Sequence, residues 1–198
     1  MKKTKKATSI VEAMIVLLII VVWIIGLYNI FNNSQKLSNS TKNRIEAIEI
    51  AREWIEAMKN IRDTNWIMFS WDKKNCFNTL NYDPTCVWWW SYSKIENNKS
   101  YKIYQDPSDF KWFLNKPSIS WNYEFKNLDY RNKFRVYKNN WFYTQTWTTN
   151  PTIFTREIKI INSTSTWMTI NSIVQWADSS KKWVHKVILT DLLTNYKE

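Results

Sequence analysis

Side chains able to do chemistry are few in this chain of 198 residues, which holds one histidine, two cysteines and one glycine. One histidine with two cysteines leaves no credible all-protein zinc site, so we expect no metal. A single glycine excludes the glycine-rich loops that cradle phosphates in nucleotide enzymes. The histidine, His185, lies in a strand-like run far from both cysteines, and no nucleophile, base and oxyanion-binding group converge. We therefore expect no catalytic residue, no cofactor and no enzymatic activity.

The two cysteines, Cys76 and Cys86, lie in an irregular stretch from Trp66 to about Lys99 that is rich in Asn and Asp. A disulfide between them would close an eleven-residue loop, and restriction of the unfolded chain would stabilise the protein by somewhat under ~3 kcal/mol. Free thiols are the alternative, which a reducing compartment would favour. We favour the disulfide because the N-terminal segment directs this stretch out of the cytoplasm.

Glu12 is the one acid inside an apolar run that extends from Ile10 to Phe31. As a helix these 22 residues cover about 33 Å, which matches the hydrocarbon core of a bilayer. The four lysines before the run predict a cytoplasmic N-terminus and an outward-facing remainder. A cleaved secretory signal is the alternative, but no small-x-small cleavage site follows the run. An acid in such a helix costs about 2.5–3.5 kcal/mol at the membrane centre, and less near its edge, unless it has a partner.

The residues around Glu12 resemble the N-terminus of the type IV pilins and the related pseudopilins. The segment reads Lys5-Lys6-Ala7-Thr8-Ser9-Ile10-Val11-Glu12-Ala13-Met14-Ile15-Val16. In that family a short basic leader ends at a small residue, usually Gly, and glutamate is the fifth residue after the cleaved bond. The resemblance places cleavage between Ala7 and Thr8, with Ala7 at the usual Gly position and Thr8 at a usually apolar one. The alternative is a carboxylate that reaches the membrane interface beside Lys5 or Lys6.

The resemblance implies a mechanism of assembly. A prepilin peptidase removes the leader and exposes the amine of Thr8, which is often N-methylated in this family. The Glu12 carboxylate then pairs with the terminal amine of a neighbouring subunit, so two costly charges neutralise each other within a helical bundle. The implied partners are the peptidase, other pilin subunits and the assembly platform in the membrane. The implied location is the cytoplasmic membrane, N-in and C-out, and then an extracellular pilus or a periplasm-spanning pseudopilus.

Four segments follow from this interpretation. They are a basic leader (1–7), a transmembrane and polymerisation helix (8–31), its amphipathic continuation (32–65) and an extracytoplasmic β-rich head (66–198). The continuation carries apolar residues at three- and four-residue intervals or their sums, which is typical of a helix with one buried face. These residues are Ile45, Ile48, Ile55 and Met58.

Beyond Lys99 the pattern changes to short runs rich in aromatic and β-branched residues, with turn residues between them. The expected strands are Ser100–Tyr104, Lys133–Tyr137, Phe142–Thr146, Ile153–Ile161, Met168–Gln175 and Val184–Thr190. One long N-terminal helix followed by consecutive antiparallel strands is an α+β fold. The pilin resemblance implies that the helix packs on the C-terminal antiparallel sheet.

Tryptophan is abundant and glycine scarce, with 14 and 1 residues respectively. Ordinary usage predicts about 14 glycines in a chain of this length, so the two counts together match a normal glycine content. Some bacteria read the codon UGA as Gly, and our hypothesis is that many of these tryptophans are glycines. The turn-like surroundings of Trp141, Trp176 and Trp183, and the run Trp88-Trp89-Trp90, support it. The alternative is a genuinely tryptophan-rich, sugar-binding surface.

The chain is basic, with a formal net charge of +11, and removal of the four leader lysines leaves it strongly positive. Candidate polyanion-binding residues are Arg131, Lys133, Arg135, Lys181, Lys182 and Lys186. Aromatic neighbours could stack on single-stranded bases, so one alternative is a competence-type pilin whose head binds DNA. A solvated, lysine-rich surface is the simpler explanation. The other alternative is an uncleaved, single-pass surface adhesin or receptor with its own surface ligand.

Overall fold

The computed structural model describes residues 10–87, 93–106, 108–118, 124–139, 142–146, 150–177 and 184–195. The chain divides into two compact units, Met1–Arg44 and Ile45–Glu198. One helix, α1 (Ile10–Met68), contributes residues to both units. Every other described element belongs to the second unit.

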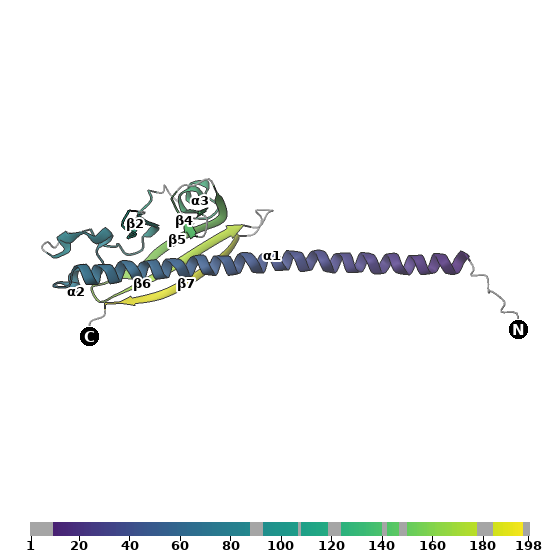
Figure 1. Cartoon of the computed structure of the whole chain (residues 1–198), viewed down its shortest axis with the longest axis horizontal. Helices are drawn as coiled ribbons and strands as arrows, with labels where there is room; N and C mark the ends of the chain where they lie inside the picture. The colour runs from purple at the N-terminus through teal and green to yellow at the C-terminus, as the bar shows by residue number, and fades with distance from the viewer. Residues whose placement is uncertain are drawn as a thin grey trace. The chain divides into compact units, whose positions relative to one another are not determined.

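The second unit combines the end of α1 with short helices and a seven-stranded antiparallel sheet (Figure 1). The helices and 3-10 turns are α2 (Lys73–Cys76), η1 (Leu80–Tyr82), η2 (Pro84–Val87) and α3 (Leu128–Phe134). The strands are β1 (Ser100–Gln105), β2 (Trp112–Asn115), β3 (Arg135–Asn139), β4 (Phe142–Thr144), β5 (Pro151–Ser163), β6 (Trp167–Ala177) and β7 (Val184–Thr194). This confirms the expected α+β fold, a long N-terminal helix packed on a C-terminal antiparallel sheet.

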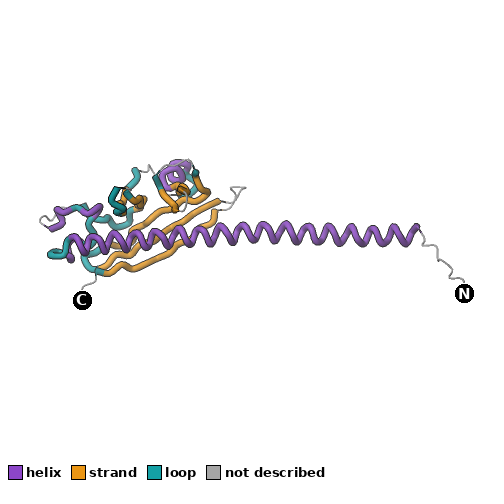
Figure 2. Tube along the Cα trace, viewed as in Figure 1, coloured by secondary structure: helices purple, strands orange, loops and turns teal. Residues whose placement is uncertain are grey.

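The long strand β5 organises the sheet. One of its edges pairs with β1 and β3, and its other edge pairs with β6, which in turn pairs with β7. The short strands β2 and β4 extend the sheet from β1 and β3. Figure 2 shows the long strands in orange beside the helix in purple.

From residue 45 onward, α1 packs on one face of the sheet because it carries a buried apolar stripe. The buried apolar residues of α1 are Ala47, Ile50, Ala51, Trp54, Ile55, Ala57, Met58 and Ile61. They pack against alternate residues of β5 and β6, among them Ile158, Ile170 and Val174. Apolar residues at helical spacing on α1 and at every second position on the strands thus form one core between the helix and the sheet. Of the expected stripe, Ile55 and Met58 are buried, whereas Ile45 is 54% exposed at the edge of the unit.

The opposite face of the sheet is covered in part by α3. Phe125, Tyr130 and Phe134 form a small buried cluster there, against which Ala177 of β6 packs. Tyr130 also donates a hydrogen bond to the carboxylate of Glu157 on β5, at 2.5 Å. Near β5 the sheet is therefore buried between α1 and α3. On β6 and β7, the face opposite α1 is more exposed.

Three element boundaries differ from the sequence expectations. The helix α1 ends at Met68 rather than at about residue 65, since the buried Asn65 side chain donates to Thr79 O at 3.1 Å and ties the last turn to the following loop. The expected strand at 133–137 begins only at Arg135. The strand β2 was not expected at all, because four residues are too few to show a clear alternation.

Residues 128–134 form α3, which includes Lys133 and Phe134 of the strand expected at 133–137, because local contacts stabilise a helix here. The side chain of Asn127 caps the helix by accepting a hydrogen bond from the Asp129 N–H at 2.9 Å. Asp129 and Lys133 form an ion pair at 3.0 Å, one helical turn apart. Tyr130 and Phe134, also four residues apart, place both rings in the buried cluster on one side of the helix.

Cys76 and Cys86 form a disulfide, as expected, with their Cα atoms 5.2 Å apart. Both sulfurs are buried beside Phe69, in a cluster separate from the main core. The bond therefore joins α2 to η2 in the stretch between α1 and β1, where regular secondary structure is sparse.

Replacing both cysteines, in the variant Cys76→Ser/Cys86→Ser, is expected to lower the free energy of unfolding by about 2–3 kcal/mol, because the short closed loop no longer restricts the unfolded chain. Chemical unfolding of the full chain in detergent, with and without reductant, measures the change. Reductant should destabilise the wild type to the same extent and leave the variant unaffected. Equal stability of the oxidised wild type and the variant would contradict this role.

Candidate functional site: the apolar helix segment and the charged residues of the head

The first unit contains a helix long and apolar enough to cross a membrane, judged by length and composition. Its side chains from Ile10 to Phe31 are almost all exposed, and the most apolar stretch has none buried. An apolar helix without a protein partner along its length suits a membrane anchor or a signal segment. No other described helix meets these criteria.

Glu12 lies in the first turn of this helix, with an exposed side chain. The positive end of the helix dipole favours a carboxylate at this position. The other two residues expected at the cleavage site, Ala7 and Thr8, lie outside the described residues.

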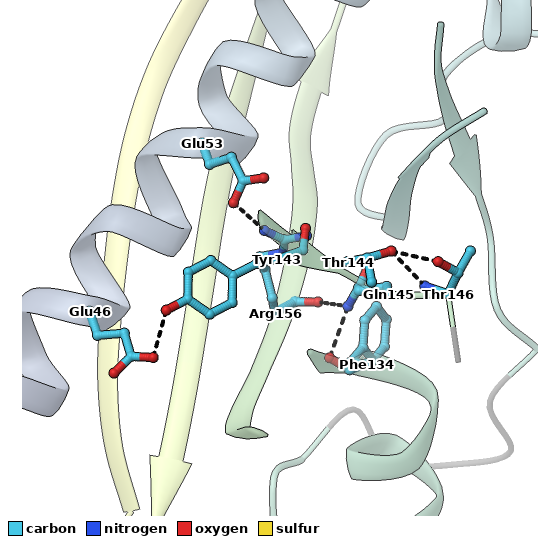
Figure 3. Close-up of polar contacts among 8 residues, drawn as sticks. All are labelled: Glu46, Glu53, Phe134, Tyr143, Thr144, Gln145, Thr146 and Arg156. Carbon is cyan, nitrogen blue, oxygen red and sulfur yellow. Dashed lines mark hydrogen bonds and ion pairs between the residues drawn. The ribbon is translucent and has the colours of Figure 1, made fainter. Parts of the chain in front are cut away.

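The second unit, the head, buries an arginine between the sheet and α1 (Figure 3). Arg156 of β5 is 1% exposed, and its Nη1 donates to Glu53 Oε2 of α1 at 3.0 Å. Its guanidinium lies over the indole of Trp54, with 3.6 Å between Cζ and the ring centroid. Stacking and ion pairing together suit the planar guanidinium, which is more weakly hydrated than an ammonium group. Arg156 thus fixes the contact between α1 and β5.

Burial perturbs both members of this pair. Burial lowers the pKa of Arg156, and the nearby carboxylate of Glu53 opposes this lowering. Burial also raises the pKa of Glu53, which Arg156 opposes by charge and hydrogen bonding. Although burial lowers the pKa of Arg156 to about 9, the guanidinium stays charged at neutral pH, and its charge limits the rise in the pKa of Glu53.

A second set of contacts holds β4 beside the same helix (Figure 3). The hydroxyl of Tyr143 donates to Glu46 of α1 at 2.7 Å. Burial, and then the hydrogen bond and charge of Glu46, raise the pKa of Tyr143, so this phenol stays protonated. The side-chain amide of Gln145 donates to the carbonyls of Phe134 and Arg156, at 2.8 and 2.6 Å. These bonds attach Gln145, the residue after β4, to the last residue of α3 and to β5.

The contacts of Arg156, Tyr143 and Gln145 hold α1, α3 and the strands in place relative to one another. Across the described ranges, no group of three or more His, Cys, Asp or Glu side chains could hold a metal ion. Glu53 and Arg156 are 103 positions apart in sequence, so the sequence contained no signal that they would meet.

The candidate polyanion-binding residues are only partly brought together. Arg131 and Lys133 lie on α3, and both have partners within the fold. The Arg131 guanidinium lies over the Phe125 ring, with Cζ 5.8 Å from the ring centroid. Lys133 pairs with Asp129 and donates to the carbonyl of Ser118. Arg135 is the C-cap residue of α3 and begins β3, Lys186 lies on β7, and Lys181 and Lys182 lie outside the described residues.

Arg135 and Lys186 share one transverse row of the sheet. Arg135 pairs with Thr155, Thr155 with Gln175, and Gln175 with Lys186. Directly paired antiparallel residues project to the same face, so both cations lie on the face opposite α1, three strand spacings or about 14 Å apart. Two cations at this distance are a weaker polyanion site than the six-residue cluster that was expected.

His185 has an ordinary structural environment, as expected from its strand-like surroundings. Its ring stacks on that of Trp176, with 5.3 Å between the centroids. The buried Trp176 in turn packs edge-to-face on Phe154 at 5.8 Å. His185 therefore extends the aromatic core at the end of β7.

The tryptophans of the described residues differ in burial. Trp54 and Trp176 are buried and Trp66 and Trp112 are partly buried, whereas Trp71 is 83% exposed. Among the described residues, positive φ occurs only at Asn81, Tyr82, Asn98 and Phe110, so no described tryptophan has a backbone that requires glycine. Trp88-Trp89-Trp90, Trp141 and Trp183 lie outside the described residues. The recoding hypothesis stays a prediction.

Comparison with known proteins found no match: no protein-family model, no curated protein and no solved structure resembles the chain closely enough to be recognised. The function is therefore inferred from the residues and from the fold.

Proposed function

We propose that this protein is a structural subunit of a type IV pilus or of a related pseudopilus. The observation that carries the proposal is the spacing from Ala7 to Glu12 at the start of an apolar helix long enough to cross a membrane. The α+β head, in which the helix from residue 45 packs on an antiparallel sheet, is consistent with it.

The proposed mechanism begins in the cytoplasmic membrane, with the basic leader inside and the head outside. A prepilin peptidase cleaves the peptide bond between Ala7 and Thr8 and leaves a positively charged amine on Thr8, a substrate for N-methylation. An assembly platform then extracts the subunit, and its apolar helix joins those of its neighbours. Since each charge is costly in an apolar bundle, the Glu12 carboxylate of one subunit pairs with the Thr8 amine of the next.

The head supports this role through rigidity. The pair of Arg156 and Glu53 and the hydrogen bond of Tyr143 to Glu46 join α1 to the sheet. The disulfide of Cys76 and Cys86 suits an oxidising location outside the cytoplasm. A subunit extracted by force needs such ties, because the pull on α1 must be passed to the head.

Peptide mass spectrometry of the protein purified from its own cells tests the proposal. We expect a mature N-terminus at Thr8, with or without a methyl group. Ala7→Gly should be processed as the wild type is, whereas Ala7→Arg should retain the leader, because the residue before the cleaved bond is small in this family. An intact Met1–Ala7 leader on the mature wild-type protein would refute the proposal and favour the uncleaved surface anchor.

The same spectra test the recoding hypothesis. Peptides that cover Trp88–Trp90 and Trp141 should be lighter by one indole side chain at each recoded position. Unaltered tryptophan masses at all four positions would reject recoding there and favour an aromatic, ligand-binding surface.

A further inference from the structure

The strand β7 presents a long free edge. It pairs with β6 over all 11 of its residues without a register shift, and no other described strand pairs with it. It contains no proline. Edge strands that stay unpaired are usually short, bulged, charged or interrupted by proline, because their free N–H and C=O groups are a template for another strand. The strand β7 is long, regular and free of proline, and of its charged residues Lys186 and Asp191, Asp191 is paired with Lys59 of α1.

Two hydrogen bonds identify the backbone groups that face this edge. The N–H of Asn195, directly after β7, points inward and donates to Thr166 O beside β6, at 2.7 Å. The N–H of Leu192 instead donates to its neighbouring side-chain atom, Asp191 Oδ1, at 2.9 Å. The N–H and C=O groups of successive residues in a strand point alternately to its two edges. The even-numbered residues of β7 therefore direct their N–H and C=O groups toward the free edge.

The same even-numbered residues carry the exposed apolar side chains of β7. Val184, Ile188 and Leu192 are 41%, 47% and 56% exposed, on the face opposite α1. On the other face, Val187 and Leu189 pack into the core and Asp191 pairs with Lys59 of α1 at 3.4 Å. The free edge therefore combines backbone groups that no other described strand pairs with and an exposed apolar stripe.

We propose that this edge pairs antiparallel with β7 of a second copy of the chain, about a two-fold axis at Ile188. In this register Ile188 faces Ile188 of the second copy, Val184 faces Leu192, and Lys186 faces Thr190. On the α1 face, His185 meets Asp191 and Val187 meets Leu189. Apolar residues thus meet apolar ones, an imidazole meets a carboxylate, and no like charges oppose each other.

Neighbouring registers are less complementary. In a two-fold pairing, each residue lies opposite a residue whose side chain is on the same face of the sheet. Moving the axis by one residue along β7 therefore changes the register of the two strands by two residues. Centring on Leu189 would place Asp191 opposite Val187 and Lys186 opposite Leu192. Centring on Thr190 would place Asp191 opposite Leu189. Only the register centred on Ile188 gives Asp191 a hydrogen-bonding partner on β7 of the second copy.

The symmetry determines which copies can meet. A two-fold axis perpendicular to the sheet reverses every direction within its plane, including that of residues 45–68 of α1, which lie on the sheet. The pair therefore joins copies whose heads point in opposite directions, as in two facing fibres or two facing cells. It does not depend on cleavage of the leader.

Cysteine cross-linking of the full-length protein in detergent micelles tests this register. The native cysteines are joined to each other, so an introduced cysteine is the one free thiol among the described residues. In Ile188→Cys the paired Cα atoms would lie about 5.5 Å apart, within disulfide range, and we expect a cross-linked dimer under mild oxidation. In Lys186→Cys the two thiols would be four strand residues apart, about 14 Å, and we expect none.

A mixture of two single variants provides the sharper test. Lys186→Cys and Thr190→Cys should each form no cross-link alone but should cross-link to each other when mixed, because residues 186 and 190 face each other across the pair. Ile188→Lys should abolish dimer formation in sedimentation experiments without changing the unfolding midpoint, because this side chain is half exposed. Cross-linking that is no greater at Ile188→Cys than at Lys186→Cys, or greater at Leu189→Cys, would overturn the proposal. So would capture of a different protein in place of a second copy.

Discussion

Replacing Glu12 by glutamine is expected to reduce incorporation of the protein into fibres by about 100-fold. In the proposed assembly this change leaves the Thr8 amine of the neighbouring subunit without a carboxylate in an apolar bundle. An uncompensated buried charge costs about 3–5 kcal/mol, and about 2.8 kcal/mol already corresponds to 100-fold in an equilibrium constant. Because Glu12 lies beyond the cleaved bond, the variant should still lose its leader.

Quantitative immunoblotting of sheared fibres against the membrane fraction measures this effect. The matched control is Glu49→Gln, which removes an exposed carboxylate from the same helix, in the part that belongs to the head. That variant should assemble as the wild type does. Normal incorporation of Glu12→Gln, with its N-terminus shown to be processed, would contradict charge pairing as the assembly determinant.

The variant Arg156→Ala is expected to lower the free energy of unfolding by about 3–5 kcal/mol, because it leaves Glu53 partly buried without its partner. The substitution also removes the guanidinium that stacks on Trp54. Arg156→Met should be milder, since an apolar side chain of similar length fills the space. Arg52→Ala, an exposed arginine on the same helix, should change stability by no more than about 0.5 kcal/mol.

The loss in Arg156→Ala should also depend on pH. Burial raises the pKa of Glu53, and removal of Arg156 takes away the group that opposes this shift. A carboxyl whose pKa is higher in the folded state stabilises the fold below its unfolded pKa, and that contribution disappears as the pH rises through the folded value. The defect relative to wild type should thus be small near pH 4 and larger at pH 7. Chemical unfolding of the full chain in detergent at both pH values measures it; a pH-independent defect would argue that lost packing is the cause.

The elements that the sequence predicted well are those whose own residues carry the signal. The helix α1 and the strands β5, β6 and β7 follow from the helical spacing of apolar residues and from runs rich in β-branched residues, although of the expected α1 stripe only Ile55 and Met58 are buried. Where local signals conflicted, the prediction was wrong: Lys133 belongs to α3, because the Asn127 cap and the ion pair of Asp129 with Lys133 stabilise a helix. The disulfide of Cys76 and Cys86 was predictable because there was no other cysteine to pair with.

The sequence by itself determined the apolar N-terminal segment, the place of Glu12 within it, the α+β order of elements and the one possible disulfide. Each of these depends on residue type and on spacing along the chain. Only the tertiary structure decided that Arg156 meets Glu53, that Arg131 and Lys133 have partners within the fold, and that β7 is the free edge of the sheet. These features depend on which distant segments pack together, and the energies that select one packing arise between residues far apart in sequence.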